Sequence, residues 1–214
     1  MIEGVKICGV SNIETLDFIS KHPYPPKFIG FITNYKKSKR YVKLDILKKL
    51  TSFKNKKINF VSVLVKPSDY ILKKIQNLNF DYFQLYDVSP KRTKFIKKRY
   101  KKKIISALTI KNKKDVLKYK LYSKVSDIIL FDGKGYEKSV GFNHKLINNI
   151  PKKIKIMIAG NIKTSNIPII NNLDYFIDLS GSLENKDGKK DLQKINNFLN
   201  TIKRYEIKKK NSFN

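Results

Sequence analysis

The segment INFVSVLV, residues 58–65, is apolar at almost every position, and it decides how the chain is expected to fold. Such a near-continuous apolar run is typical of a parallel strand covered on both faces, whereas a half-solvated strand alternates apolar and polar residues. Similar short runs recur along the whole chain, and together they predict a sheet of eight buried parallel strands. The other seven runs are VKICGV (5–10), FIGFIT (28–33), YFQLY (82–86), KIISALT (103–109), DIILFD (127–132), KIMIAG (155–160) and YFIDLS (175–180).

Polar segments with helical spacing lie between these runs. Their apolar residues recur at intervals of three and four, so that one face of each helix can pack on the sheet. Ser68, Ser89 and Asn112 are residue types that cap helix N-termini, and each stands at the start of such a segment. The clearest segments are DILKKLTSF (45–53), DYILKKIQNL (69–78), HKLINNI (144–150) and DLQKINNFLNTIKRY (191–205).

Strand and helix alternate to the end of the chain without a linker, which predicts one α/β domain. Eight units fit a closed barrel better than an open sheet, because closure leaves no edge strand. We therefore expect a single (β/α)₈ TIM barrel over residues 1–207, followed by a polar, basic tail over residues 208–214.

The chain is strongly basic: its 214 residues include 47 Lys and Arg against 17 Asp and Glu, a formal net charge of +30. Such a charge raises nucleic acid as a partner. However, the bases are mostly Lys spread along the whole chain, and the sequence is rich in Asn, Ile, Phe and Tyr, as an A/T-biased genome would produce. We therefore favour compositional drift, with mild attraction to an anionic substrate, over a nucleic-acid function.

Targeting signals and disulfides are not expected either. No apolar run approaches the ~18 residues that span a bilayer, and the start MIEGVKICGV lacks the order of a signal peptide. A single Cys rules out an internal disulfide framework and favours the reducing cytoplasm. We expect a monomer or a homodimer without a membrane partner.

Small and polar residues follow the strands at the end where barrel enzymes place their active sites. We therefore expect a pocket at this mouth. Gly lets backbone N–H groups approach an anion closely, so the loops after the last two strands predict a phosphate site made by Gly160, Asn161, Ser180, Gly181 and Ser182. The segments that end the strands or follow them are Cys8-Gly9, Ser38-Lys39-Arg40, Gln84-Leu85-Tyr86, Asp132-Gly133, Ala159-Gly160-Asn161 and Asp178-Leu179-Ser180-Gly181-Ser182.

The order of motifs from Lys6 to Asp191 resembles the phosphoribosylanthranilate isomerase family of tryptophan synthesis. Two departures stand out. Tyr86-Asp87 replace the His-Gly of the family, and GKGYEKSVGF (133–142) replaces a Gly-rich loop that closes over the substrate in relatives. Asn161 also replaces a Gly after the seventh strand. The motifs are KICG (6–9), GFI (30–32) with S-x-R (38–40), QL (84–85), FD (131–132), AG (159–160) and DLSGSLE (178–184) with GKKD (188–191).

The resemblance implies an Amadori rearrangement of N-(5-phosphoribosyl)anthranilate, a small phosphorylated substrate, without a cofactor or a metal. It implies Asp132 as the acid that opens the sugar ring and Cys8 as the base that removes the C2 proton. Such an acid must keep its proton near neutral pH, and such a base requires a lowered thiol pKa. Arg40 would pair with the anthranilate carboxylate through its planar fork, and Gln84 and Asp178 would contact the substrate.

Each residue also has a plainer interpretation. A lone Cys8 on a strand is by default a small core residue, Asp132 can cap a helix, Asp178 can hold a loop, and Arg40 can be a surface arginine.

Two other functions compete with the leading one. The isomerase barrel of histidine synthesis is opposed by Cys8, because that barrel uses an Asp at the end of its first strand. A decayed barrel that binds RNA or another anion without turnover predicts a positive face away from the mouth.

Overall fold

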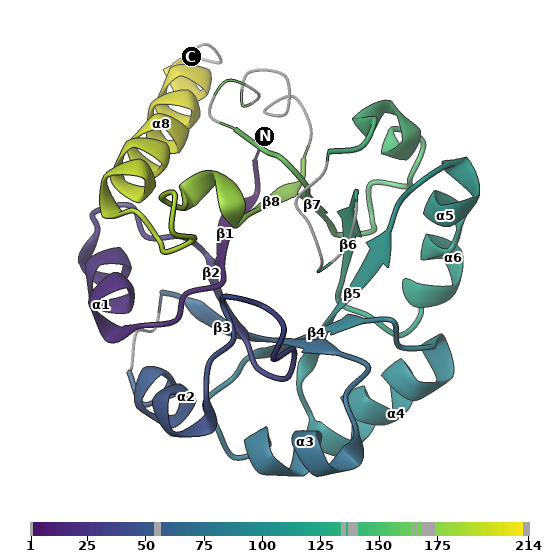
Figure 1. The fold of residues 1–214 in the computed structure, drawn as a ribbon. Helices are drawn as coiled ribbons and strands as arrows, with labels where there is room; N and C mark the ends of the chain where they lie inside the picture. Colours follow the sequence, from purple (N-terminus) through teal and green to yellow (C-terminus); the bar gives the residue numbers. More distant parts are fainter. Residues whose placement is uncertain are drawn as a thin grey trace.

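In the computed structural model, the part of the chain that is described forms a closed barrel of parallel strands in the order β1 to β8, as predicted (Figure 1). The described residues are 2–53, 57–133, 136, 141–163, 165, 167 and 174–211, with side chains up to Tyr205. The strands are β1 (Gly4–Cys8), β2 (Phe28–Ile32), β3 (Asn59–Val65), β4 (Tyr82–Tyr86), β5 (Lys103–Thr109), β6 (Ile128–Asp132), β7 (Ile156–Ala159) and β8 (Phe176–Leu179).

Helices surround the barrel, and α8 lies beside α1 (Figure 1). The predicted caps are confirmed: the side chains of Ser68, Ser89 and Asn112 each accept a hydrogen bond from a backbone N–H in the first turn of the helix that follows. The helices are α1 (Ile13–Lys21), α2 (Leu44–Thr51), α3 (Asp69–Ile75), α4 (Pro90–Tyr100), α5 (Lys113–Leu117), α6 (Tyr119–Tyr122) and α8 (Leu192–Asn211). None of the described helices is long and apolar enough to cross a membrane.

One predicted helix and one predicted boundary differ from the structure. HKLINNI was expected to form an α-helix, but only a short 3₁₀ helix, η1 (His144–Ile147), forms between β6 and β7. Pro151 follows closely and cannot continue a helix. At the end of the chain, α8 runs on to Asn211, beyond the boundary at residue 207.

Alternation along the strands produces two apolar layers, one between sheet and helices and one inside the barrel. The inner layer also carries polar side chains: Lys6, Gln84 and Asp178 are buried on the inward-facing positions. Because the strands are parallel, their carboxyl ends meet at one mouth, and of these three residues Asp178 lines the pocket there. The apolar members of the inner layer are Cys8, Phe28, Val61, Val63, Tyr86, Ile105, Ala107, Ile128, Leu130, Met157, Ala159 and Phe176.

Candidate active site

One pocket at the carboxyl mouth brings together most of the residues that the sequence singled out. Cys8 and Asp132, at the ends of β1 and β6, line this mouth pocket together with Asp178 of β8 and with Arg40. The other lining residues are Ile32, Tyr35, Ser38, Val63, Val65, Tyr86, Tyr136, Ala159, Gly160 and Ser180. The pocket therefore combines a thiol, two carboxyl groups and a guanidinium group with apolar and aromatic walls.

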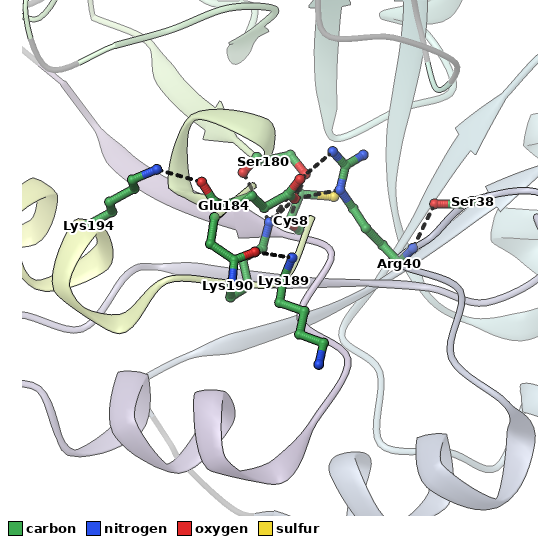
Figure 2. Close-up of polar contacts among 9 residues, drawn as sticks. Cys8, Ser38, Arg40, Ser180, Glu184, Lys189, Lys190 and Lys194 are labelled. Carbon is green, nitrogen blue, oxygen red and sulfur yellow. Dashed lines mark hydrogen bonds and ion pairs between the residues drawn. The ribbon is translucent and has the colours of Figure 1, made fainter. Parts of the chain in front are cut away.

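Arg40 is held by a network of ionic hydrogen bonds on one side of this pocket (Figure 2). Its Nε and Nη2 donate to the two carboxylate oxygens of Glu184, at 2.5 and 2.8 Å. Glu184 also accepts a 2.6 Å bond from Lys190, whose ammonium group donates to the backbone carbonyl of Ser180 at 3.0 Å. The side chains of Glu184 and Lys190 are only 8% and 2% exposed. Arg40 is thus fixed through one edge of its guanidinium group, and Nη1 lies on the other edge.

Arg40 and Lys190 lower the pKa of Glu184. Burial opposes ionisation of Glu184, but the hydrogen bond from Arg40 and the charge of Lys190 outweigh it and hold the pKa of Glu184 below its ordinary value. Burial lowers the pKa of Lys190 in spite of Glu184. The network therefore keeps Glu184 ionised at neutral pH.

Gly9 allows Arg40 to lie against β1. Its φ of +80° lies in the left-handed region, and a Cβ placed there would collide with the side chain of Arg40. Glycine is the residue that adopts such a conformation at little cost. The Gly of the KICG motif thus has a packing role beside the thiol.

Beneath the mouth pocket lies a buried ion pair that the sequence did not predict. Lys6, on β1, is 0% exposed, and its Nζ donates to Oδ2 of Asp178 at 2.8 Å. The two residues face each other in the register of β1 and β8. Burial disfavours the charged form of Lys6, but the charge of Asp178 reverses this effect and raises the pKa of Lys6.

The thiol of Cys8 does not have the lowered pKa that its role as a base requires. Burial raises the pKa of Cys8, and the positive charge of Lys6 offsets this only in part, because Asp178 acts in the opposite direction. The prediction of a lowered pKa is therefore wrong. The hydroxyl of Ser180 donates to the Cys8 carbonyl at 3.1 Å, which ties the loop after β8 to the end of β1.

Asp132 lies on the other side of the pocket among aromatic rings. The Tyr86 hydroxyl donates to its Oδ2 at 3.0 Å. The ring of Tyr136 packs edge-on against Tyr86 and Tyr35, with centroid separations of 5.4 and 4.9 Å. Burial raises the pKa of Tyr86 well above its ordinary value, which keeps the phenol protonated and able to donate.

Some predicted residues lie elsewhere. Gln84 is fully buried and lies outside the pocket lining, with its amide donating to the Tyr86 hydroxyl at 3.3 Å. Gly160 and Ser180 line the mouth pocket, whereas Ser182 is exposed and lines a separate cavity. Gly181 starts the 3₁₀ helix η3 (Gly181–Leu183). Asn161 is exposed, with a φ of +49° at a position where the family has Gly.

Part of the loop after β6 lies outside the described residues, namely 134–135 and 137–140. Most of the segment that replaces the Gly-rich loop of the family, residues 133–142, therefore lies outside the described residues.

For three residues of the site no individual role was predicted from the sequence: Lys6, Glu184 and Lys190. All three belong to motifs quoted for the resemblance, KICG, DLSGSLE and GKKD. Lys6 meets Asp178 and Glu184 meets Arg40 across more than 140 residues, so that spacing in the sequence could not reveal these contacts. Lys190 contacts Glu184 only six residues away, but that spacing alone predicts no ion pair.

A parallel barrel that gathers a thiol, carboxyl groups and an arginine in one pocket at its carboxyl mouth has the design of a (β/α)₈-barrel enzyme. The family model for N-(5'-phosphoribosyl)anthranilate (PRA) isomerase matches residues 5–201. The chain belongs to this family.

Relatives agree over nearly the full length. N-(5'-phosphoribosyl)anthranilate isomerase of Sulfurihydrogenibium sp. strain YO3AOP1 is 32% identical over 93% of this chain and 98% of that protein. The isomerase of Rhizobium rhizogenes strain K84 is 29% identical over 94% and 95%. Among solved structures, phosphoribosylanthranilate isomerase of Thermotoga maritima superposes with a TM-score of 0.80 at 23% identity, covering 95% of this chain and 99% of that one. At this identity the superposition bears on the fold alone.

Proposed function

We propose that the protein converts N-(5'-phosphoribosyl)anthranilate to 1-(2-carboxyphenylamino)-1-deoxyribulose 5-phosphate, a step of tryptophan synthesis. Membership of the isomerase family supports this activity. A further solved isomerase, 24% identical, is described in complex with the reduced form of this product. The observation that carries the proposal is the placement of Cys8 and Asp132 in one pocket with Arg40.

Asp132 is the proposed acid. It gives its proton to the ring oxygen of the ribose as the bond between this oxygen and C1 breaks, and the anthranilate nitrogen forms a Schiff base with C1. The Tyr86 hydroxyl, 3.0 Å from Oδ2, orients the carboxyl group for this transfer. Proton transfer by a positioned group typically accelerates such a step by about 10²- to 10⁴-fold.

Cys8 is the proposed base. As a thiolate it removes the proton from C2 of the opened sugar, the electron pair moves toward the Schiff base, and an enolamine results. The enolamine then tautomerises to the ketone at C2, so no atom is gained or lost overall. A thiolate is required because a neutral thiol is too weak a base for this proton.

Arg40 and Asp178 are proposed to hold the substrate. Glu184 occupies the Nε–Nη2 edge of Arg40, so the edge that carries Nη1 can pair with the anthranilate carboxylate. Asp178 is buried with its Oδ1 unpaired within the described residues, while Oδ2 accepts from Lys6. A buried acceptor without a partner is costly, so a hydroxyl or amine of the substrate is a natural donor to it. Gln84 then acts through Tyr86, which it contacts.

The phosphate site stays a proposal, formed by the backbone of Gly160 and Asn161 and by Ser180, Gly181 and Ser182. Gly160 has a φ of +98° and lines the mouth pocket with Ser180. Replacing Gly181→Val should raise KM by about tenfold with little change in kcat, because the bulk would push the phosphate from the backbone amides. The matched control is Gly188→Asn, at a glycine outside the pocket lining whose φ of +78° Asn tolerates and whose added Cβ would lie 3.6 Å from the Lys39 side chain. An unchanged KM in Gly181→Val would refute the assignment.

The remaining expectations follow from this activity. A cytoplasmic location suits a biosynthetic enzyme, and nucleic acid is not an expected partner. The T. maritima relative is described as a dimeric protein of which monomers were generated. We infer a monomer or a homodimer for this chain, which light scattering after gel filtration would distinguish.

The direct test is an assay with phosphoribosylanthranilate generated in situ. Loss of its fluorescence should depend on the protein and should stop in Cys8→Ser. If the purified, folded protein leaves the fluorescence unchanged, the isomerase proposal is wrong and the alternative of an anion-binding barrel without turnover takes its place.

A further inference from the structure

We propose that Lys6 is a positioning residue for the base: its buried ammonium group stabilises the thiolate form of Cys8, while Asp178 draws part of this charge away from the sulfur. The inference deepens the proposed function, since it says how the thiol of Cys8 can serve as a base. Neither the proposed acid nor the proposed substrate contacts use Lys6.

The backbone places the ammonium group next to the sulfur. Lys6 and Cys8 are two residues apart on β1, so both side chains point to the inside of the barrel. Gly30 of β2 faces them. A Cβ built on Gly30 would lie 3.0 Å from Sγ of Cys8 and 3.1 Å from Nζ of Lys6. Both atoms thus crowd the space above this glycine, and any larger residue there would push them away.

The surroundings make this contact strong. Lys6 is 0% exposed and Cys8 only 8%, so little water screens the interaction. The nearest negative group, Asp178, accepts one of the three N–H bonds of Lys6 at 2.8 Å. The remaining N–H groups can serve the sulfur, and hydrogen bonding to Lys6 lowers the pKa of Cys8 as its charge does.

Other charged groups also face Cys8. Lys190, in the segment after β8, lowers the thiol pKa to a smaller extent than Lys6 does. Arg40 lies over Gly9 and interacts with Cys8, and on the far side of the pocket Tyr86 does so as well. Among these groups Lys6 acts most strongly in favour of the thiolate and Asp178 most strongly against it, apart from burial itself.

This balance predicts opposite effects for the two members of one ion pair. Lys6→Met removes the positive charge and should make the thiolate rarer. Asp178→Asn removes the competitor and should make it more abundant. A pair that only held the fold together would weaken the protein in either variant and would not move the thiol in opposite directions.

The readout is alkylation of the thiol by iodoacetamide across a pH range of about 6 to 10, followed by mass spectrometry. Cys8 is the only cysteine of the chain, so the signal has one source. Near neutral pH we expect alkylation to slow by about tenfold in Lys6→Met and to accelerate by several-fold in Asp178→Asn. The alkylation rate of each denatured variant gives the reactivity of the exposed thiol, and the rate of the folded variant is divided by it.

A matched control exists on the surface. Lys21 and Asp17 form an exposed pair on α1, also at 2.8 Å, and Lys21→Met and Asp17→Asn should leave alkylation unchanged. Because Lys6→Met leaves Asp178 buried without its partner, this variant is paired with Lys6→Met/Asp178→Asn, which removes both charges. The double variant should react more slowly than Asp178→Asn alone, even if the single Lys6 variant fails to fold.

Equal rates in Asp178→Asn and the double variant would overturn the inference, as would a change in the same direction in both single variants. Alkylation needs no turnover, so these outcomes are independent of the isomerase assay. In the isomerase assay, the acidic limb of the plot of kcat/KM against pH reports the pKa of the base. This limb should lie at higher pH in the double variant than in Asp178→Asn.

Discussion

The mouth of the barrel has two sides with different chemistry. The ionic side consists of Lys6, Cys8, Arg40, Asp178, Glu184 and Lys190, from β1, β8 and the loops after β2 and β8. The aromatic side consists of Tyr35, Tyr86, Asp132 and Tyr136, from β4, β6 and the loops after β2 and β6. All residues of the ionic side belong to motifs that resemble the family. On the aromatic side, Tyr86 stands where the family has His, and Tyr136 lies in the loop that departs from it.

The two sides differ in how much a single change costs. On the ionic side each buried charge has a partner, and removing one partner leaves the other charge uncompensated in a medium of low polarity, at a cost of about 3 to 5 kcal/mol. On the aromatic side the contacts are ring edges and the hydroxyl groups of Tyr86 and Tyr136, and another ring with a donor can replace them. The difference explains how residues can change on one side while the chemistry of the pocket is kept.

The largest effect is expected where each side supplies its reacting group. Cys8→Ser on the ionic side and Asp132→Asn on the aromatic side should each lower kcat by about 10²- to 10⁴-fold with KM little changed. A serine hydroxyl is too weak a base near neutral pH, and an amide has no proton for the ring oxygen. The measurement is kcat for each variant, with circular dichroism to confirm folding.

The double variant sharpens this result. Since acid and base act on one reaction coordinate, their losses should not add fully. A single variant that retains activity within about threefold of the parent, far below the contribution of such a group, would remove that residue from the mechanism.

The fold could be predicted from the sequence because strand burial is a local signal. Runs such as INFVSVLV carry it, and β3 covers almost the same residues. The ends of the strands then gave Cys8, Asp132 and Asp178, which do share the pocket. HKLINNI shows the limit of local patterns, since its apolar spacing is helical but only one short 3₁₀ turn forms.

The contacts between distant segments could not be predicted in the same way. Lys6 in the sequence is one of 47 basic residues, and nothing local distinguishes a fully buried lysine from a surface one. Only closure of the barrel, which pairs β1 with β8, brings it to Asp178. The raised thiol pKa has the same origin, because burial by residues from several strands outweighs the charge of a sequence neighbour.

The next largest effect concerns the ionic side alone. Glu184→Gln should raise KM by about tenfold, because the fork that fixes Arg40 is broken and its free edge is no longer aimed at the substrate. The effect should vanish with an analogue that lacks the anthranilate carboxylate. Glu14→Gln, an exposed residue on α1, is the control. A similar loss for both substrates would show that Glu184 supports the fold and not the arginine.

Glu184→Gln should also change how the free energy of unfolding depends on pH. The pKa of Glu184 is lower in the folded protein than in the unfolded chain, so its ionised form stabilises the fold above the ordinary carboxyl pKa, and this stabilisation is lost as pH falls through the folded value. At neutral pH the parent should exceed Glu184→Gln by about 3 kcal/mol in free energy of unfolding, the lower end of the range above, because Arg40 is only partly buried. Denaturant titrations should show this difference shrinking in acid.

The smallest effect is expected on the aromatic side. Tyr86→Phe keeps the ring that packs on Tyr136 and removes the hydroxyl that donates to Asp132. Because the carboxyl group loses an orienting bond of about 1 kcal/mol, kcat should fall by about three- to tenfold with KM unchanged. Tyr86→His, which restores the family residue and a ring donor, should recover most of this loss. Gln84 reaches the acid only through the same hydroxyl, so Gln84→Met should cost less than Tyr86→Phe and add little to it. A loss in Tyr86→Phe as large as that of Asp132→Asn would make the phenol itself a proton donor, and the two sides would then no longer differ in the way described.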